Sequence, residues 1–125
     1  MASFRFAQWL VEWFENQSYF AFEWDLGNRT KNWLKHEIST AEAESVFQEV
    51  EAIRVLGEQV SPKVNEPRYG ILGLTYNLKH VFVCFTIRGA GIRIIHIRKM
   101  NKKERSLYAE LCKEWKRLWQ RKIQR

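Results

Sequence analysis

The chain has 125 residues, which suits one domain built around one hydrophobic core. Hydrophobic residues make up 46% of it, and this share excludes a globally disordered chain. The formal net charge is +7 and is unevenly placed, because residues 98–125 hold 11 Lys or Arg against three Glu. A basic segment behind a near-neutral body favours a polyanionic partner, an acidic protein partner or both, although a solvated helix face would have the same composition.

The cysteines and histidines show no metal-binding spacing. Cys84 and Cys112 are far apart in the sequence, and the three histidines are scattered. Charged residues such as Arg5 and Glu12 interrupt the N-terminal apolar residues, so neither a secretory signal nor a membrane span is predicted. We therefore expect a cytoplasmic protein of one domain, residues 1–125, with two reduced thiols and with no metal or cofactor.

The first half of the chain predicts helices around one strand. Apolar residues at helical spacing predict an amphipathic helix over 3–16, which we expect to dock on the body because its polar face is poor in Lys and Arg. A strand over 19–24 and a short helix over 26–36 follow. Ser39 and Glu42 have the spacing of a capping box, so another helix begins there. Its expected buried residues are Ala43, Val46, Phe47 and Val50.

The second half predicts a sheet and a final helix. Strands are expected over 52–57, 68–76, 80–88 and 91–98, with hairpin turns at 76–79 and 89–91. Asn101 with Glu104 begins a long helix that is mostly basic. The fold class is therefore α+β, with helices beside a mainly antiparallel sheet of four to five strands.

Alternation along two of these strands assigns side chains to faces. In the strand over 80–88, Val81, Val83, Phe85 and Ile87 form an apolar face, and Arg88 lies on the opposite one. In the strand over 91–98, Ile92, Ile94, His96 and Arg98 share a face if no bulge intervenes.

The polar residues near the ends of these strands suit metal-free cleavage of RNA. In that reaction the ribose 2′-OH attacks the adjacent phosphate; Glu or neutral His can take its proton, Arg and Lys can stabilise the phosphorane, and a protonated His can serve the leaving oxygen. The candidate catalytic residues are His36, Glu66, Arg68, Arg88 and Arg98. The candidate RNA-binding residues are Lys35, Arg93, His96, Lys99, Lys102 and Lys103. We predict that His36, Glu66, Arg88 and Arg98 converge on one open hollow, although purely structural ion pairs would use the same residue types.

Two tryptophans of the last helix are candidates for partner binding. Trp115 and Trp119 lie on a basic helix and could anchor an acidic protein. The alternative is that both pack against the helix over 3–16 of the same chain.

The order of short motifs resembles the BrnT toxin family. The motifs are Phe22-Glu23-Trp24-Asp25, Asn32 with Lys35-His36, Ser39-x-x-Glu42-Ala43-x-x-Val46-Phe47, Glu66-x-Arg68, Gly73 with Thr75, Thr86-x-Arg88-Gly89, Arg93-Ile94-Ile95-x-x-Arg98 and Glu104-Arg105-x-x-Tyr108. The resemblance covers about residues 22–110, which leaves the helix over 3–16 and a basic extension over 111–125 as additions. It implies a RelE-like fold, an endoribonuclease toxin of a type II toxin-antitoxin system that inhibits translation, and a BrnA-like antitoxin as partner.

The chain departs from the family pattern at three places. Asn28 stands where the family usually has Lys, Glu37 where it has Gly, and His96-Ile97 where it has Ser-Ala. A second hypothesis therefore stays open, namely a catalytically inactive module with the same fold that binds nucleic acid or a protein partner.

Overall fold

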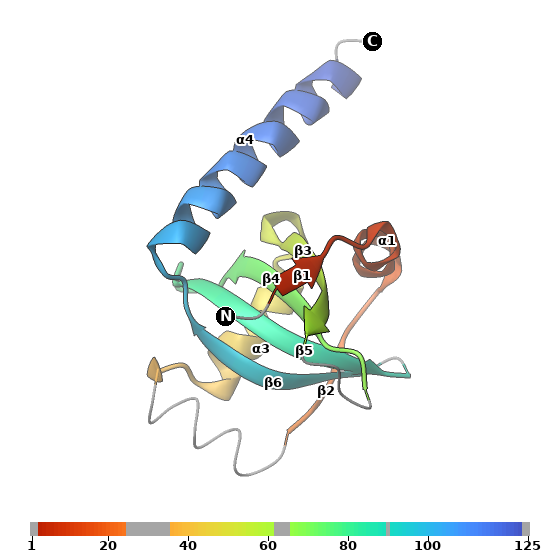
Figure 1. The fold of residues 1–125 in the computed structure, drawn as a ribbon, viewed down its shortest axis with the longest axis vertical. Coiled ribbons are helices and arrows are strands. Elements are labelled where there is room, and N and C mark those ends of the chain that lie inside the picture. Colours follow the sequence, from red (N-terminus) through yellow and green to blue (C-terminus); the bar gives the residue numbers. More distant parts are fainter. Residues whose placement is uncertain (1–2, 25–35, 62–65, 90, 124–125) are drawn as a thin grey trace.

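The computed structural model describes residues 3–24, 36–61, 66–89 and 91–123, and it contains a six-stranded sheet with the strand order β1-β3-β4-β5-β6-β2 (Figure 1). The strands are β1 Ser3–Arg5, β2 Ala21–Glu23, β3 Arg54–Ser61, β4 Tyr69–Leu74, β5 His80–Arg88 and β6 Gly91–Lys99. The helices are α1 Gln8–Asn16, α3 Thr40–Gln48, the 3-10 turn Val50–Ala52 and α4 Lys102–Ile123. The predicted α+β class and the mainly antiparallel pairing are confirmed. The predicted helix over 26–36 lies outside the described residues, apart from His36.

The strand count was underestimated because the first residues form β1 instead of helix. Phe4 pairs with Gln59 of β3, and its ring lies over Gly70 of β4, where a Cβ would come within 2.6 Å of it. The helix begins at Gln8 and docks on the body through Leu10 and Phe14, as expected. The beginning of the predicted helix over 3–16 is therefore wrong. Because Gly70 has no side chain, an extended segment can pack the half-buried ring of Phe4 against β4.

One pairing is parallel. β2 lies beside β6 at the edge of the sheet, with Phe22 opposite Ile92. The chain between them contains α3 and three strands, and this long connection allows the parallel direction.

A β-bulge in β6 corrects the predicted faces. Cys84 of β5 pairs with His96 and Phe85 pairs with Ile94, so Ile95 is an extra residue. Ile92, Ile94 and Ile97 pack into the core beneath α1 and α3, whereas Ile95 packs with the cluster on the opposite face. The prediction that Ile92, Ile94, His96 and Arg98 share a face is therefore wrong. The apolar face of β5 is confirmed.

The helix starts predicted at Ser39 and at Asn101 are confirmed. The Ser39 hydroxyl accepts from the Glu42 amide at 3.1 Å, and the Glu42 carboxylate accepts from the Ser39 amide at 3.0 Å. Asn101 and Glu104 exchange the equivalent bonds at 2.8 and 2.9 Å. These reciprocal bonds satisfy amides that have no partner within the helix.

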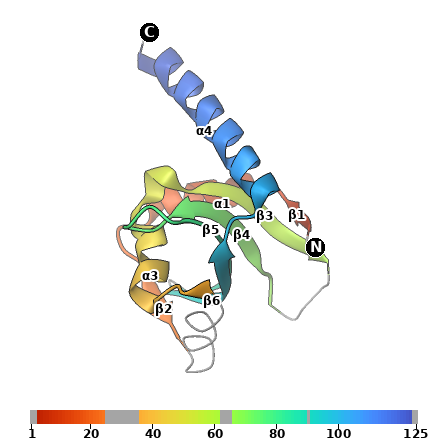
Figure 2. The ribbon, with the colours of Figure 1, turned by 90° about the vertical axis from the view of Figure 1, so that its left-hand side faces the viewer.

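Among the described side chains, those that anchor the long helix α4 to the body lie at its foot. Tyr108 is buried in the second apolar cluster, and its hydroxyl donates to the Ala52 carbonyl at 2.6 Å. The far half of α4 rises away from the sheet and from α1 in both ribbon views (Figures 1 and 2). The side chains of Trp115 and Trp119 lie outside the described part of the structure, but this path does not carry their helix against α1.

Cys84 is buried, Cys112 is half-buried, and both thiols are free, as expected. Within the described part of the chain, no helix combines the length and apolarity needed to cross a bilayer.

Candidate functional site

The predicted site residues form two groups at opposite ends of the β5–β6 hairpin. Arg88 ends β5 opposite Gly91, whereas Arg98 lies opposite Phe82, six residues earlier in β5. At about 3.4 Å per residue, this separates the two arginine backbones by about 20 Å. The predicted convergence of His36, Glu66, Arg88 and Arg98 on one hollow is therefore wrong. Antiparallel pairing places the C-terminal ends of β5 and β6, which carry Arg88 and Arg98, at opposite ends of the hairpin.

The first group, which we call the arginine cluster, consists of Glu23, Glu66, Arg68, Arg88 and Arg93. Arg88 donates from Nε and Nη2 to the two oxygens of Glu66 at 2.9 and 2.8 Å, and from Nη1 to Glu23 at 3.3 Å. The side chains of Arg88, Glu66 and Glu23 are 40%, 45% and 56% exposed. A polyanion in solvent can therefore reach this cluster.

The electrostatics of the arginine cluster keep Glu66 ionised. The hydrogen bonds from Arg88 lower the pKa of Glu66 below its ordinary value, and the charges of Arg88, Arg93 and Arg68 act in the same direction. With three arginines and two glutamates, the cluster keeps one positive charge in excess. An anionic carboxylate beside cations is an arrangement that can accept a proton while stabilising a phosphate.

Local contacts bring the loop residues to this place. The Thr86 hydroxyl donates to the Pro67 carbonyl at 2.9 Å, which fixes the residue between Glu66 and Arg68 against β5. Thr86 lies opposite Arg93 in the sheet. This contact helps to bring Glu66 and Arg68 to the end of the hairpin where Arg88 and Arg93 lie.

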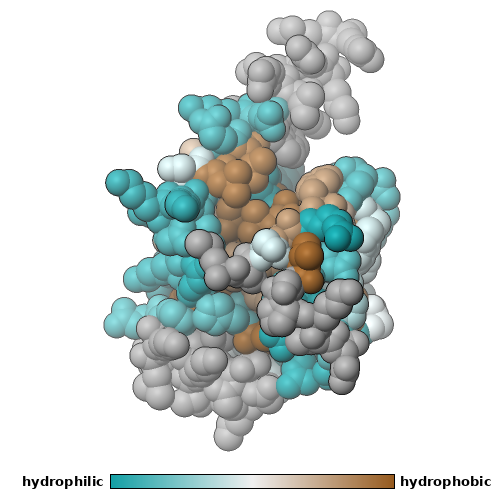
Figure 3. All heavy atoms as spheres, in the orientation of Figure 1, coloured by the Kyte–Doolittle hydropathy of each residue, from teal (hydrophilic) through white to brown (hydrophobic). Residues whose placement is uncertain are grey.

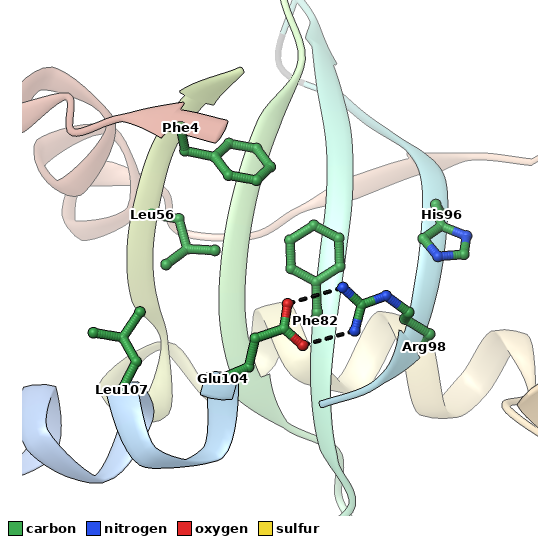
Figure 4. Close-up of a pocket in the computed structure, with 7 residues that line it drawn as sticks. All are labelled: Phe4, Leu56, Phe82, His96, Arg98, Glu104 and Leu107. Carbon is green, nitrogen blue, oxygen red and sulfur yellow. Dashed lines mark hydrogen bonds and ion pairs between the residues drawn. The ribbon is translucent and has the colours of Figure 1, made fainter. Parts of the chain in front are cut away.

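The second group lines a cavity of about 490 Å³ between the sheet and the foot of α4, which we call the hollow (Figure 4). Its lining residues are Phe4, Leu56, Phe82, His96, Arg98, Glu104 and Leu107. Arg98 donates from both terminal nitrogens to Glu104 at 2.6 and 2.8 Å, and its Cζ lies 4.6 Å from the centre of the Phe82 ring. Apolar surface gathers beside the foot of α4 and is bordered by hydrophilic residues (Figure 3).

Glu104 enters the hollow because it also caps α4. Burial alone would raise the pKa of Glu104, but the hydrogen bonds from Arg98 and from the Asn101 amide lower it below the ordinary range. Glu104 is therefore ionised at neutral pH. The side chains of Arg98 and Glu104 are only 26% and 14% exposed.

Of the remaining predicted residues that the structure describes, the two histidines lie at the hollow and the lysines belong to neither group. The His36 and His96 rings stand perpendicular with centres 5.4 Å apart, so His36 belongs with the hollow and not with Glu66. Lys99, Lys102 and Lys103 are exposed at the junction of β6 and α4. Lys35 lies outside the described residues.

Sequence reasoning missed Glu23, Glu104, Phe4 and Phe82 as members of these groups. Glu104 had a signal, because the capping position at the start of α4 lies only six residues after Arg98. Phe82 also had one, because strand alternation places it on the face of Arg88. Glu23 and Phe4 reach their groups through pairings of β2 and β1 that no local pattern indicates.

Among the described residues, no three His, Cys, Asp or Glu side chains gather in a group that could hold a metal ion. The arginine cluster combines guanidinium and carboxylate groups, and the hollow adds the imidazole of His96. These are functional groups that recognise or transform a phosphodiester.

A family model described as "Ribonuclease toxin, BrnT, of type II toxin-antitoxin system" matches residues 24–104, which is more than half of the chain. This match places the chain in the class of type II ribonuclease toxins, whose substrate is RNA and whose partner is an antitoxin protein. Within this class, the chain belongs to the BrnT family. The family resemblance of its motifs is confirmed, whereas the segment before residue 24 and most of α4 lie outside the match. No individual curated protein sequence matched the chain.

Proposed function

We propose that this chain is a metal-independent endoribonuclease with a RelE-like fold, that it cleaves RNA at the arginine cluster, and that it thereby inhibits translation. Glu66 takes the proton of a ribose 2′-OH, and the oxygen attacks the adjacent phosphorus. The P–O5′ bond breaks, water protonates the leaving oxygen, and the products carry a 2′,3′-cyclic phosphate and a 5′-OH. Arg68, Arg88 and Arg93 stabilise the negative charge that the phosphorane gains.

One observation carries this proposal. Glu66 accepts two hydrogen bonds from Arg88 in a solvent-exposed cluster that also holds Arg68 and Arg93. The hollow supports cleavage less well, because its single arginine is paired with Glu104, whereas the arginine cluster has three arginines against two glutamates.

The test uses purified protein and single-stranded RNA in EDTA, with analysis of the product ends. We expect cleavage that leaves cyclic phosphate, and a loss of about 10²–10³-fold in rate for Arg88→Ala, the usual effect of removing one donor to a developing oxyanion. Glu66→Gln removes the base and should lower the rate as strongly. Matched controls are Glu58→Gln and Arg105→Ala, both at exposed positions outside the arginine cluster.

The same assay contains the outcomes that oppose the proposal. RNA binding without cleavage would favour the inactive binding module, and cleavage that requires added divalent metal would exclude the mechanism above. Full activity in Glu66→Gln would place the reaction elsewhere on the protein.

The partner is proposed to be a BrnA-like antitoxin. Co-expression should yield a toxin–antitoxin complex, and induction of the toxin alone should arrest growth and lower protein synthesis. The antitoxin should relieve both effects.

A further inference from the structure

The hollow contains a flat cationic group that is held rigidly from two sides. Glu104 binds both terminal nitrogens of Arg98, and the Phe82 ring lies beneath its guanidinium carbon. A guanidinium so fixed presents a planar π surface on its remaining side, and Arg98 is 26% exposed and lines the cavity. Such surfaces stack on the bases of single-stranded RNA.

We propose that the hollow is a binding site for one unpaired RNA base, which stacks on the Arg98–Glu104 pair. This proposal rests on the proposed function only in taking RNA as the substrate. Phe4, Leu56 and Leu107 supply an apolar wall for the base, and His96 supplies a further ring (Figure 4). The volume of about 490 Å³ lies in the range of small-ligand pockets, about 300–1,000 Å³.

The charges of the hollow favour a base over a phosphate. Arg98 and Glu104 cancel each other, and four of the seven lining residues are apolar. A phosphate placed against Arg98 would meet the Glu104 carboxylate and would lose hydration against phenylalanine and leucine. The arginine cluster has the opposite character, because its arginines outnumber its glutamates and it is open to solvent.

The hollow and the arginine cluster lie on the same face of the sheet. Every second side chain of β5 lies on that face, from Phe82 at the hollow through Cys84 and Thr86 to Arg88 at the cluster. No strand therefore separates the two sites. The distance of about 20 Å corresponds to no more than about six nucleotides at a stacked rise of 3.4 Å. One RNA strand can therefore occupy both sites, with the bound base up to six nucleotides from the cleaved bond.

The test measures binding without cleavage, by fluorescence anisotropy at one fixed salt concentration. The probes are a 2′-O-methyl RNA dodecamer of mixed sequence, whose blocked oxygen cannot attack, and a twelve-unit abasic phosphodiester chain of equal charge. Arg98→Lys keeps the charge and removes the flat surface. We expect this variant to bind the dodecamer about five- to a hundredfold more weakly, the effect of one stacked base, and to bind the abasic chain within about twofold of the unaltered protein.

Further variants keep the result interpretable. Leu107→Ala, at a 43% exposed position, should also weaken binding of the dodecamer but not of the abasic chain. Arg105→Lys, at an exposed position outside the hollow, should change neither. Thermal melting by circular dichroism establishes that each variant is folded.

Several outcomes would overturn the proposal. Equal weakening of both probes by Arg98→Lys would indicate a phosphate contact, and unchanged binding of both would exclude RNA from the hollow. Loss of antitoxin affinity with unchanged RNA affinity would identify the hollow as a protein-docking site. Intact base preference in a protein that never cleaves RNA would refute only the proposed function.

Discussion

Glu42 is a single buried carboxylate that joins α3 to the turn between β4 and β5. Its Oε2 lies 2.8 Å from Lys79 Nζ, and the residue is 4% exposed. Burial alone would raise the pKa of Glu42, but hydrogen bonds from Lys79, Ser39 and Asn77 and the charge of Lys79 lower it from 4.5 to about 2. The carboxylate therefore stabilises the fold only while it is ionised.

We expect the free energy of unfolding to fall as the pH drops from about 5 to 2. The unfolded chain binds this proton near the ordinary glutamate pKa, whereas folded Glu42 resists it down to about 2. The contribution that is present above pH 5 and lost by pH 2 is roughly 3 kcal/mol. Urea denaturation across this range should show a weaker pH dependence in Glu42→Gln than in Glu51→Gln, an exposed control. Equal pH dependence in the two variants would contradict the assignment.

Leu78 is a residue whose backbone conformation does not suit its side chain. It has a φ of +64° in the β4–β5 turn, and 71% of its side chain is exposed. A leucine in this left-handed region costs about 1 kcal/mol or more, and asparagine tolerates the region better. We expect Leu78→Asn to raise the free energy of unfolding by about 1 kcal/mol and the Tm by about 3–5 °C. Tyr76→Asn, a neighbouring exposed control, should bring no such gain, and a lower Tm for Leu78→Asn would count against strain at this position.

At the scale of elements, α4 has two parts: a foot that packs on the body, and a remainder that projects away from it. Tyr108 and the capping pair hold the foot, whereas the helix extends beyond it to Ile123. In the sequence, residues 114–125 carry five Lys or Arg and one Glu. We expect truncation after Lys113 to leave the Tm within a few degrees and to weaken antitoxin binding strongly. The measurements are thermal melting and isothermal titration with the purified antitoxin.

A full-length Trp115→Ala/Trp119→Ala variant is the matched control, because it keeps every charge of α4. Weak binding in both proteins would assign the contact to the tryptophans, and weak binding in the truncation alone would assign it to the basic residues. A large drop in Tm with unchanged affinity would show that this segment supports the fold and not the partner contact.

Elements that rest on local signals were predictable, and those that rest on distant contacts were not. The caps at Ser39 and Asn101 and the turn before His80 were predicted because each is decided within a few residues. β1 and the parallel pairing of β2 depend on strands more than fifty residues away in the sequence. No periodicity within 3–16 could have indicated that Phe4 pairs with β3.

At the scale of the whole molecule, the candidate site was predictable in its residue types but not in its geometry. The grouping of Glu66 with Arg88 is confirmed by two hydrogen bonds. The prediction that His36 and Arg98 join this pair is wrong, because β6 runs antiparallel to β5 and carries Arg98 away from Arg88. The hairpin thus divides one expected centre into two, which is the basis for assigning cleavage to one end and base recognition to the other.

Because Ile95 is the extra residue of a bulge, its presence or absence does not change which residues on either side of it face the core. Without Ile95, Ile97 would still pair with Val83 inside and Arg98 would still pair with Phe82 outside. What the extra residue adds is local twist and a second neighbouring side chain on the outer face. The strand can therefore change its curvature at the hollow by a one-residue insertion or deletion while the core beneath keeps its composition.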